Sequence, residues 1–226
     1  DPDKLLSISL GSAETTLLKL SSAYCSFVNG GKLINPIIID RIQDSQGNTI
    51  FNSESRFCKN CKKISYLSKN LPVIEDSFEQ VFSSQTAYQI TSMLEGAIQR
   101  GTGKGLRELK LDLAGKTGTT NKNTDTWFIG FTSNLVVGVY IGHDEPKSLG
   151  RYETGAKTAM PVFKKFVKQA ISKSDARPFK VSKDIKMMVV DSKTGKKAEY
   201  GSENNIIEAF KTESFNKNSF EQKENL

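Results

Sequence analysis

Three strand-like segments follow one another in the middle of the sequence, and they do most to limit how the chain can fold. They span residues 113–119, 126–131 and 135–141, and a turn over Thr132-Ser133-Asn134 joins the last two into a hairpin. Apolar residues recur at helical spacing before and after this region, in residues 84–100 and 159–171. Strands followed by a covering helix predict an antiparallel β-sheet covered by helices, which is an α+β fold.

The N-terminal part of the chain adds three further elements. Residues 15–29 predict a helix, which the glycine pair at 30–31 ends. Residues 36–42 predict a strand that returns through a polar turn to residues 50–51 as a hairpin. Residues 52–72 are polar and irregular and predict an insertion loop. The positions expected to face the core are Leu17, Leu20, Tyr24, Phe27 and Val28 in the first helix, Ala87, Ile90, Met93, Leu94, Ala97 and Ile98 in the second, and Met160, Phe163, Phe166, Val167 and Ile171 in the third.

The composition changes toward the C-terminal end and suggests a division into three parts. Residues 1–172 hold the periodic segments and form the main predicted domain. Residues 173–210 predict a small β extension, and residues 211–226 are polar with few apolar anchors, which predicts a disordered tail.

The charge balance is basic, with a formal net charge of +7 over 226 residues. A basic surface suits a nucleic acid, an anionic lipid or a carboxylate-bearing polymer, and a lysine-rich solvated surface would give the same balance. The sequence has no repeat of basic and aromatic residues and no helix-turn-helix pattern, so a nucleic-acid-binding domain is disfavoured. Trp127 and Phe128 are expected in the core and a cleft wall. No run of about 18 apolar residues occurs, so no membrane-spanning helix is predicted.

Cysteine and histidine content gives little support to a metal site. Cys25 lies in the first predicted helix and is expected to be a buried apolar residue. Cys58 and Cys61 form a single C-x-x-C motif, whereas a zinc ribbon needs a second pair. A local disulfide and two free thiols both stay open for this pair. His143 is the only histidine, which excludes a multi-histidine metal site within this chain, and it is expected to be a structural or surface residue.

The candidate functional residues lie in the segment LAGKTGTT, at the first strand of the central region. Strand alternation puts Lys116 and Gly118 on one face and Thr117 and Thr119 on the other. Gly115 and Gly118 remove side-chain bulk, so another backbone or a ligand can approach closely. Edge amides, hydroxyls and one ammonium together suit an anion. The sequence therefore predicts a carboxylate receptor on this strand.

Two segments look similar but are assigned to other roles. Residues 193–195 repeat the tripeptide Lys-Thr-Gly between charged residues, where a turn is predicted. The segment GTGKGL at residues 101–106 resembles a phosphate-binding loop. That motif needs a glycine where Ile98 stands and a serine or threonine where Gly105 stands, so the assignment fails.

Four segments, in the same order, resemble the class A, bifunctional penicillin-binding proteins, and most of all their penicillin-binding protein 1A group. Residues 10–31 (LGSAETTLLKLSSAYCSFVNGG) resemble the family's segment that leads into a helix, and residues 91–103 (TSMLEGAIQRGTG) its next helix and exit loop. Residues 113–150 look like its third active-site motif with the following strands, and residues 153–166 (ETGAKTAMPVFKKF) like its last helix. The resemblance implies a serine β-lactamase/transpeptidase-like fold, of which this chain would be the C-terminal part.

The resemblance also implies a chemistry. Enzymes of this family carry Ser-x-x-Lys, Ser-x-Asn and Lys-Thr-Gly motifs. Their serine attacks the D-alanyl-D-alanine end of a peptidoglycan stem peptide and forms an acyl-enzyme, and an amino group of a neighbouring stem then takes the acyl group and cross-links the wall. The whole protein would also bind β-lactams. By resemblance, Lys116 would assist proton transfer and attract the substrate carboxylate, and the hydroxyls of Thr117 and Thr119 would bind it. Gly118 would keep the strand clear, and the Thr119 N–H would be an oxyanion donor. No cofactor or metal is implied.

The first two motifs have no counterpart in a suitable place. Residues 214–217 fit Ser-x-x-Lys only in the predicted tail, and residues 68–70 and 202–204 fit Ser-x-Asn outside any predicted helix. In the family both motifs precede the segment at 10–31, so the resemblance implies that they lie upstream of Asp1. The glycosyltransferase domain would lie there too, with a membrane anchor that holds the enzyme on the periplasmic face of the bacterial inner membrane. This piece alone is expected to be inactive. The alternative is a truncated or split-gene product that acts, if at all, as a non-catalytic interaction piece.

Overall fold

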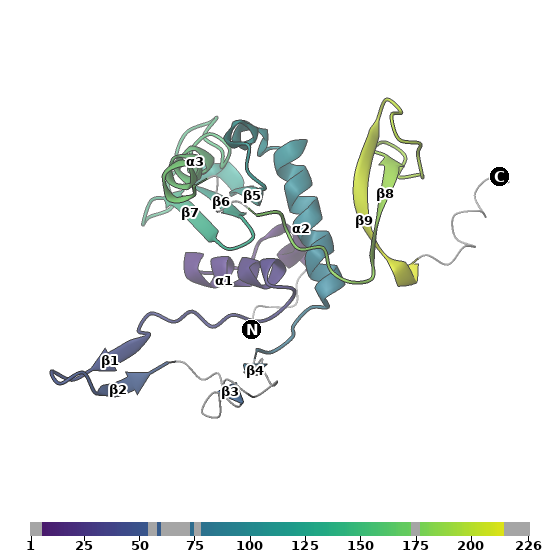
Figure 1. Ribbon diagram of the computed structural model, residues 1–226. Helices are drawn as coiled ribbons and strands as arrows, with labels where there is room; N and C mark the ends of the chain where they lie inside the picture. The colour runs from purple at the N-terminus through teal and green to yellow at the C-terminus, as the bar shows by residue number, and fades with distance from the viewer. Residues whose placement is uncertain (1–5, 54–57, 60–72, 75–77, 173–176, 215–226) are drawn as a thin grey trace.

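The centre of the molecule is a three-stranded antiparallel sheet in the order β5-β6-β7 (Figure 1). Its strands are β5 (Ala114–Thr119), β6 (Asp125–Phe131) and β7 (Val136–Gly142), as the sequence predicts to within one residue at each end. The register pairs Lys116 with Ile129 and Gly118 with Trp127. The computed structural model describes residues 6–53, 58–59, 73–74, 78–172 and 177–214.

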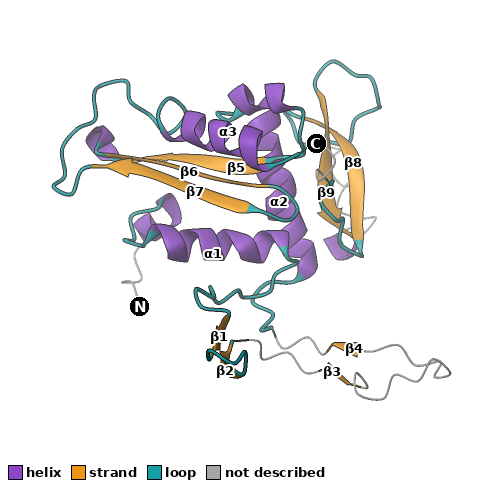
Figure 2. Ribbon diagram, turned by 60° about the vertical axis from the view of Figure 1, so that its left-hand side comes forward, coloured by secondary structure: helices purple, strands orange, loops and turns teal. Residues whose placement is uncertain are grey.

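Helices cover both faces of this sheet (Figure 2). α1 (Leu17–Val28) lies against β7, where Gly138 leaves room for Leu17 and Ser21. α3 (Ala159–Ala170) lies on the opposite face, and its Phe163 packs against Phe128 with ring centroids 4.8 Å apart. α2 (Ser84–Gln99) contacts β5, so the predicted antiparallel sheet covered by helices is confirmed.

Local sequence signals set the ends of the helices. The side chain of Thr16 caps α1 by accepting from the Lys19 N–H, and Ser83 caps α2 by accepting from the Thr86 N–H. After α1 the chain turns at Gly31, whose φ is +94°. A Cβ atom at Gly31 would stand 2.7 Å from Gln80 Nε2, so only glycine fits where the chain crosses the segment before α2.

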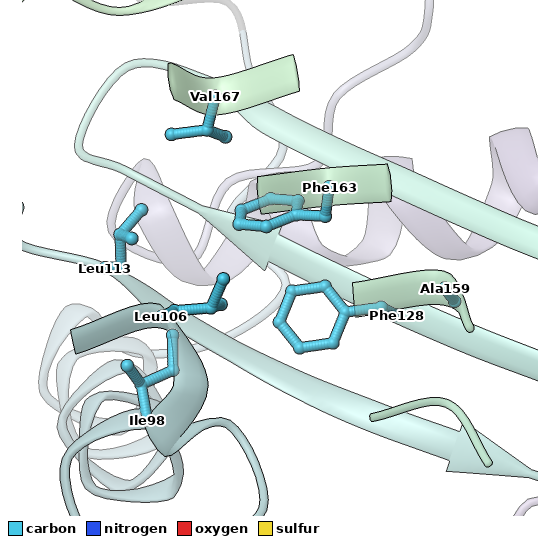
Figure 3. Packing of buried hydrophobic residues seen from close by; sticks show 7 residues of the cluster. All are labelled: Ile98, Leu106, Leu113, Phe128, Ala159, Phe163 and Val167. Carbon is cyan, nitrogen blue, oxygen red and sulfur yellow. The ribbon is translucent and has the colours of Figure 1, made fainter. Parts of the chain in front are cut away.

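The hydrophobic core lies between β6, α3 and the end of α2 (Figure 3). A short 3₁₀ helix, η3 (Lys104–Leu109), follows α2 and adds one apolar side chain to it. Every member is fully buried, so this cluster contributes to the apolar burial that stabilises the sheet. Its members are Ile98, Leu106, Leu113, Phe128, Ala159, Phe163 and Val167.

A separate hairpin of β8 (Ile185–Asp191) and β9 (Asn205–Lys211) stands beside α2 (Figure 1). Polar contacts join it to that helix. Gln89 donates to the Ala209 carbonyl at 2.9 Å, and Arg100 pairs with Glu208 at 2.8 Å. Apart from Lys211, the hairpin lies in the predicted β extension, and the division at residues 172 and 210 stays a prediction.

The N-terminal hairpin is shorter than predicted. β1 (Arg41–Gln43) pairs with β2 (Thr49–Asn52), but residues 36–40 form no strand, so the expectation of a strand over 36–42 is wrong for all but its last two residues. The side chains of Ile37, Ile38 and Ile39 are exposed, so no described residue covers them, and the Asp40 carbonyl accepts from the Ser53 N–H at 2.9 Å. Of the predicted insertion loop at residues 52–72, the structure describes residues 52–53 and the short strand β3 (Cys58–Lys59), which pairs with β4 (Val73–Ile74) just after the loop.

Two predicted core positions are wrong. Met93 is 59% exposed and Phe166 is 48% exposed. At about 100° per residue, Met93 lies roughly 120° around α2 from the buried Ala87, and Phe166 lies at the margin of the stripe centred on Phe163.

Three short 3₁₀ segments complete the described fold: η1 (Leu6–Leu10), η4 (Asn121–Asn123) and η5 (Thr212–Ser214). Across the described residues, no helix combines the length and apolar character needed to span a membrane. Residues 215–226, most of the predicted tail, lie outside the described residues.

Candidate functional site

The strand β5 forms one edge of the sheet that the structure describes, because it pairs only with β6 there. Just after the strand, the Thr120 N–H donates to the Asp125 carbonyl at 3.0 Å. Hydrogen-bonding direction alternates along an antiparallel strand, so Gly118 and Lys116 also bond toward β6. The backbone amides of Thr117 and Thr119 therefore point to the free edge, where a ligand backbone or an anion can reach them.

The Lys116 side chain reaches the same edge. It is exposed, and its ammonium donates to the Thr117 carbonyl at 2.8 Å. Since that carbonyl points away from β6, the ammonium lies beside the free edge of the strand. The predicted alternation is confirmed, because Lys116 shares a face with the cross-strand residue Ile129.

The two threonine hydroxyls on the other face each have one partner. Thr117 Oγ1 lies 3.0 Å from Thr102 Oγ1, in the loop between α2 and η3. Thr119 Oγ1 accepts from the Gly155 N–H at 3.0 Å, in the loop before α3. Both hydroxyls are thus held by loops that come from different parts of the chain.

Glycine at two positions allows close packing around the strand. A Cβ atom at Gly155 would stand 2.5 Å from the Trp127 carbonyl oxygen and 2.6 Å from that of Gly118. A Cβ atom at Gly118 would stand 3.1 Å from Trp127 Cβ. The loop before α3 therefore lies directly on the backbone of β5 and β6, which fixes the position of the Thr119 side chain.

The loop after β5 is braced internally and to the segment before α3. Thr120 and Thr124 share a hydroxyl hydrogen bond of 2.8 Å. The Asn123 amide donates to the carbonyls of Gly150 and Arg151, both at 2.9 Å. These contacts hold the end of β5 and the Gly155 loop in one arrangement, so the strand edge is presented on a rigid support.

An aromatic pair closes the α1 side of the sheet next to Gly118. The rings of Trp127 and Tyr140 lie 4.6 Å apart, edge to face. The Tyr140 hydroxyl donates to Asp125 at 3.0 Å, and this hydrogen bond is the largest cause that raises the pKa of Tyr140. Trp127 is half-buried and Phe128 is fully buried, which confirms the expected core position of Phe128.

Other residues that the sequence singled out lie elsewhere. The second Lys-Thr-Gly is a turn after β8, as predicted, in which the Lys193 and Thr194 N–H groups donate to Asp191. His143 is exposed. Cys25 is half-buried rather than fully buried, and burial raises the pKa of its thiol.

The remaining sequence candidates that the structure describes do not join the β5 edge. Ser202 donates to the Glu199 carbonyl in an exposed turn, whereas residues 68–70, residues 215–217 and Cys61 lie outside the described part of the chain. Within the described residues, no three His, Cys, Asp or Glu side chains gather closely enough to hold a metal ion.

Comparison with known proteins decides the family. The sequence matches the family described as the penicillin binding protein transpeptidase domain over residues 3–168. The chain belongs to this family. As a member, it has the predicted mixed fold of helices and antiparallel sheet, and the predicted resemblance to penicillin-binding proteins is confirmed.

Individual members of the transpeptidase family agree with this assignment. Penicillin-binding protein 1A of Rickettsia prowazekii is 42% identical over 93% of the chain, and that of Pseudomonas aeruginosa is 30% identical over 92%. The crystal structure of penicillin-binding protein 1A from Haemophilus influenzae superposes with a TM-score of 0.74 at 32% identity, over 89% of this chain and 33% of that one. The chain spans 27% of the Rickettsia protein and 29% of the Pseudomonas protein.

Proposed function

We propose that this chain forms one wall of a peptidoglycan D,D-transpeptidase active site, namely the wall that holds the terminal carboxylate of the stem peptide. Lys116 attracts the carboxylate and assists proton transfer. The hydroxyls of Thr117 and Thr119 bind the carboxylate, and Gly118 keeps the strand clear for the substrate. The Thr119 N–H is one donor of the oxyanion hole.

The observation that carries this proposal is the convergence of donors on the free edge of β5. The Lys116 ammonium lies there, and the amides of Thr117 and Thr119 point outward beside it. Hydrogen bonds to a charged partner contribute about 1.5–3 kcal/mol each, so this set suits a carboxylate better than a neutral group. An oxyanion donor contributes about 3–4 kcal/mol in comparable enzymes.

The proposed reaction needs groups from the rest of the enzyme. A serine in a Ser-x-x-Lys motif supplies the nucleophile, and its acyl-enzyme passes to an amino group of a second stem peptide. Transfer to water instead would make the enzyme a carboxypeptidase. The proposed partners are therefore stem peptides and β-lactams, and the proposed location is the periplasmic face of the inner membrane, through an anchor outside this chain. The fragment by itself is proposed to be inactive.

Labelling with a fluorescent penicillin tests the proposal in the full-length protein that carries this chain. Lys116→Ala should lower the acylation rate by about 100-fold, since a positioned proton-transfer group typically contributes that much or more. The chain offers a matched control, because Lys193→Ala removes the lysine of the second Lys-Thr-Gly in an exposed turn. This control should be labelled like the wild type.

Two outcomes would contradict the proposal. Undiminished labelling of Lys116→Ala would remove Lys116 from the site. Failure of the full-length wild type to react with any penicillin, together with salt-dependent binding of generic DNA, would favour a nucleic-acid-binding role for the basic surface.

A further inference from the structure

The segment Gly101-Thr102-Gly103 presents one threonine from a very tight turn at the end of α2. The N–H groups of Gly101 and Gly103 both donate to the Ala97 carbonyl, at 3.1 and 3.0 Å. A Cβ atom at Gly101 would stand 2.8 Å from that oxygen, and one at Gly103 would stand 3.0 Å from Ile98 Cγ1. The two glycines let the chain fold back onto the last turn of the helix, and Thr102 stands at the tip of this turn.

The hydroxyl of Thr102 meets the hydroxyl of Thr117 across 3.0 Å. Each hydroxyl has a single proton, so only one of the two can donate within this pair. When an anion accepts the Thr117 proton, Thr117 Oγ1 can only accept from Thr102. The Thr102 proton then points at Thr117, and the Thr117 proton is free to point at the anion.

The hydroxyl of Thr119 is held in the same way, but its donor is a backbone N–H instead of a side chain. Thr119 Oγ1 accepts from the Gly155 N–H, which has no acceptor function, so the Thr119 proton also stays available for an anion. Both carboxylate-binding hydroxyls would thus receive one hydrogen bond and donate one. Such chains polarise each member and strengthen the terminal bond.

We propose that Thr102 is a positioning residue that donates to Thr117 and thereby aims the Thr117 proton at the substrate carboxylate. This inference rests on the proposed function of the β5 edge. It assigns a role to the glycine-rich segment at residues 101–106, which does not fit a phosphate-binding loop. Thr102 would then act only through Thr117. A purely structural residue would affect the site whether or not the Thr117 hydroxyl is present.

The test measures acylation rates with a fluorescent penicillin in the full-length protein. Thr102→Val keeps the shape but removes the donor and should lower the second-order acylation rate by about fivefold, the size expected for one neutral hydrogen bond. Thr102→Ser restores the donor and should regain most of that rate. Thr49→Val is the matched control, because Thr49 lies exposed on β2, and it should behave like the wild type.

A double-mutant cycle separates positioning from general structural support. In a Thr117→Val background, Thr102→Val should cause no further loss, because the proton that it aims is already absent. Urea midpoints of all variants identify any loss that arises from unfolding.

The outcomes distinguish this inference from the proposed function. Equal labelling of Thr102→Val and wild type, alongside loss of labelling in Lys116→Ala, would overturn the role of Thr102 and leave the proposed function standing. A Thr102→Val loss that persists undiminished without the Thr117 hydroxyl would also overturn it. Absence of labelling in the wild type would overturn both.

Discussion

At the residue scale, the position of Gly155 leaves no room for a side chain. Its N–H holds the Thr119 hydroxyl, and its α-carbon lies so near the sheet that a methyl group would meet the carbonyl oxygens of Trp127 and Gly118. Those oxygens belong to strand backbone, so they cannot move aside without moving the strand. The position therefore couples the loop before α3 to the candidate site.

Gly155→Ala should destabilise the chain by about 1–3 kcal/mol, the usual cost of overpacking, as measured by urea unfolding. Gly105→Ala is the matched control. The one atom that its new methyl would approach is the flexible end of Met160, at 3.2 Å, so the change should stay within about 0.5 kcal/mol. Equal urea midpoints for the two variants would show that the loop moves freely away from the strand.

The residues of the candidate site were predictable from sequence to different degrees. Strand alternation and flanking glycines are local signals, and they located Lys116, Thr117 and Thr119 on the correct strand and faces. Thr102 and Gly155 were missed as site residues, since they lie 15 and 36 positions from their hydroxyl partners. Only the glycines beside Thr102 marked that segment, and they do not say which strand it meets.

At the scale of elements, helix ends set by local capping residues were predictable from the sequence. Strand ends were not predictable where they depend on a pairing strand. α2 begins at a serine cap and ends before Gly101, both visible in the sequence. The isoleucine-rich segment at residues 36–42 has strong strand propensity, yet only its end forms a strand, because a strand forms where a partner supplies hydrogen bonds. Met93 was misplaced since apolar character alone does not define the centre of a helical stripe.

α2 also carries a carboxyl group that should make stability depend on pH. Burial, followed by the charge of Asp112, raises the pKa of Glu95 from 4.5 to about 7. The folded chain therefore binds this proton more tightly than the unfolded chain. Its stabilising effect is complete below about pH 4.5 and is lost as the pH rises through about 7.

Glu95→Gln should consequently change little at pH 4 and should raise the free energy of unfolding at pH 8 by about 1 kcal/mol, because solvent screens the partly exposed carboxyl. Urea unfolding at both pH values measures this difference. Glu108→Gln is the control of opposite sign. The hydrogen bond and charge of Lys164 lower the Glu108 pKa, so that variant should not gain stability at pH 8. If Glu95→Gln changed the free energy of unfolding equally at both pH values, the pKa of Glu95 would not be raised.

At the scale of the whole molecule, the described chain divides into a sheet with a shared core and a hairpin attached beside it. All members of the main core cluster lie between Ile98 and Val167. The β8–β9 hairpin contributes none of them and is joined to α2 through Gln89, Arg100 and a 2.7 Å hydrogen bond from Lys211 to Thr86. The buried apolar side chains of the hairpin, Met188, Val190 and Ala209, lie outside that cluster. A segment that shares no side chain with the main core can open at a lower free energy than the core.

Hydrogen exchange should therefore be faster in β8 and β9 than in β5, β6 and β7. The double variant Gln89→Ala/Arg100→Ala removes two of the contacts to α2 and should speed exchange in the hairpin by about 5- to 10-fold, while the sheet keeps its protection. Lys164→Ala breaks the 2.9 Å ion pair with Glu108, away from the hairpin, and should leave hairpin exchange unchanged. If hairpin amides exchange as slowly as those of β6, the hairpin and sheet unfold as one unit, and the two-part description of the molecule is wrong.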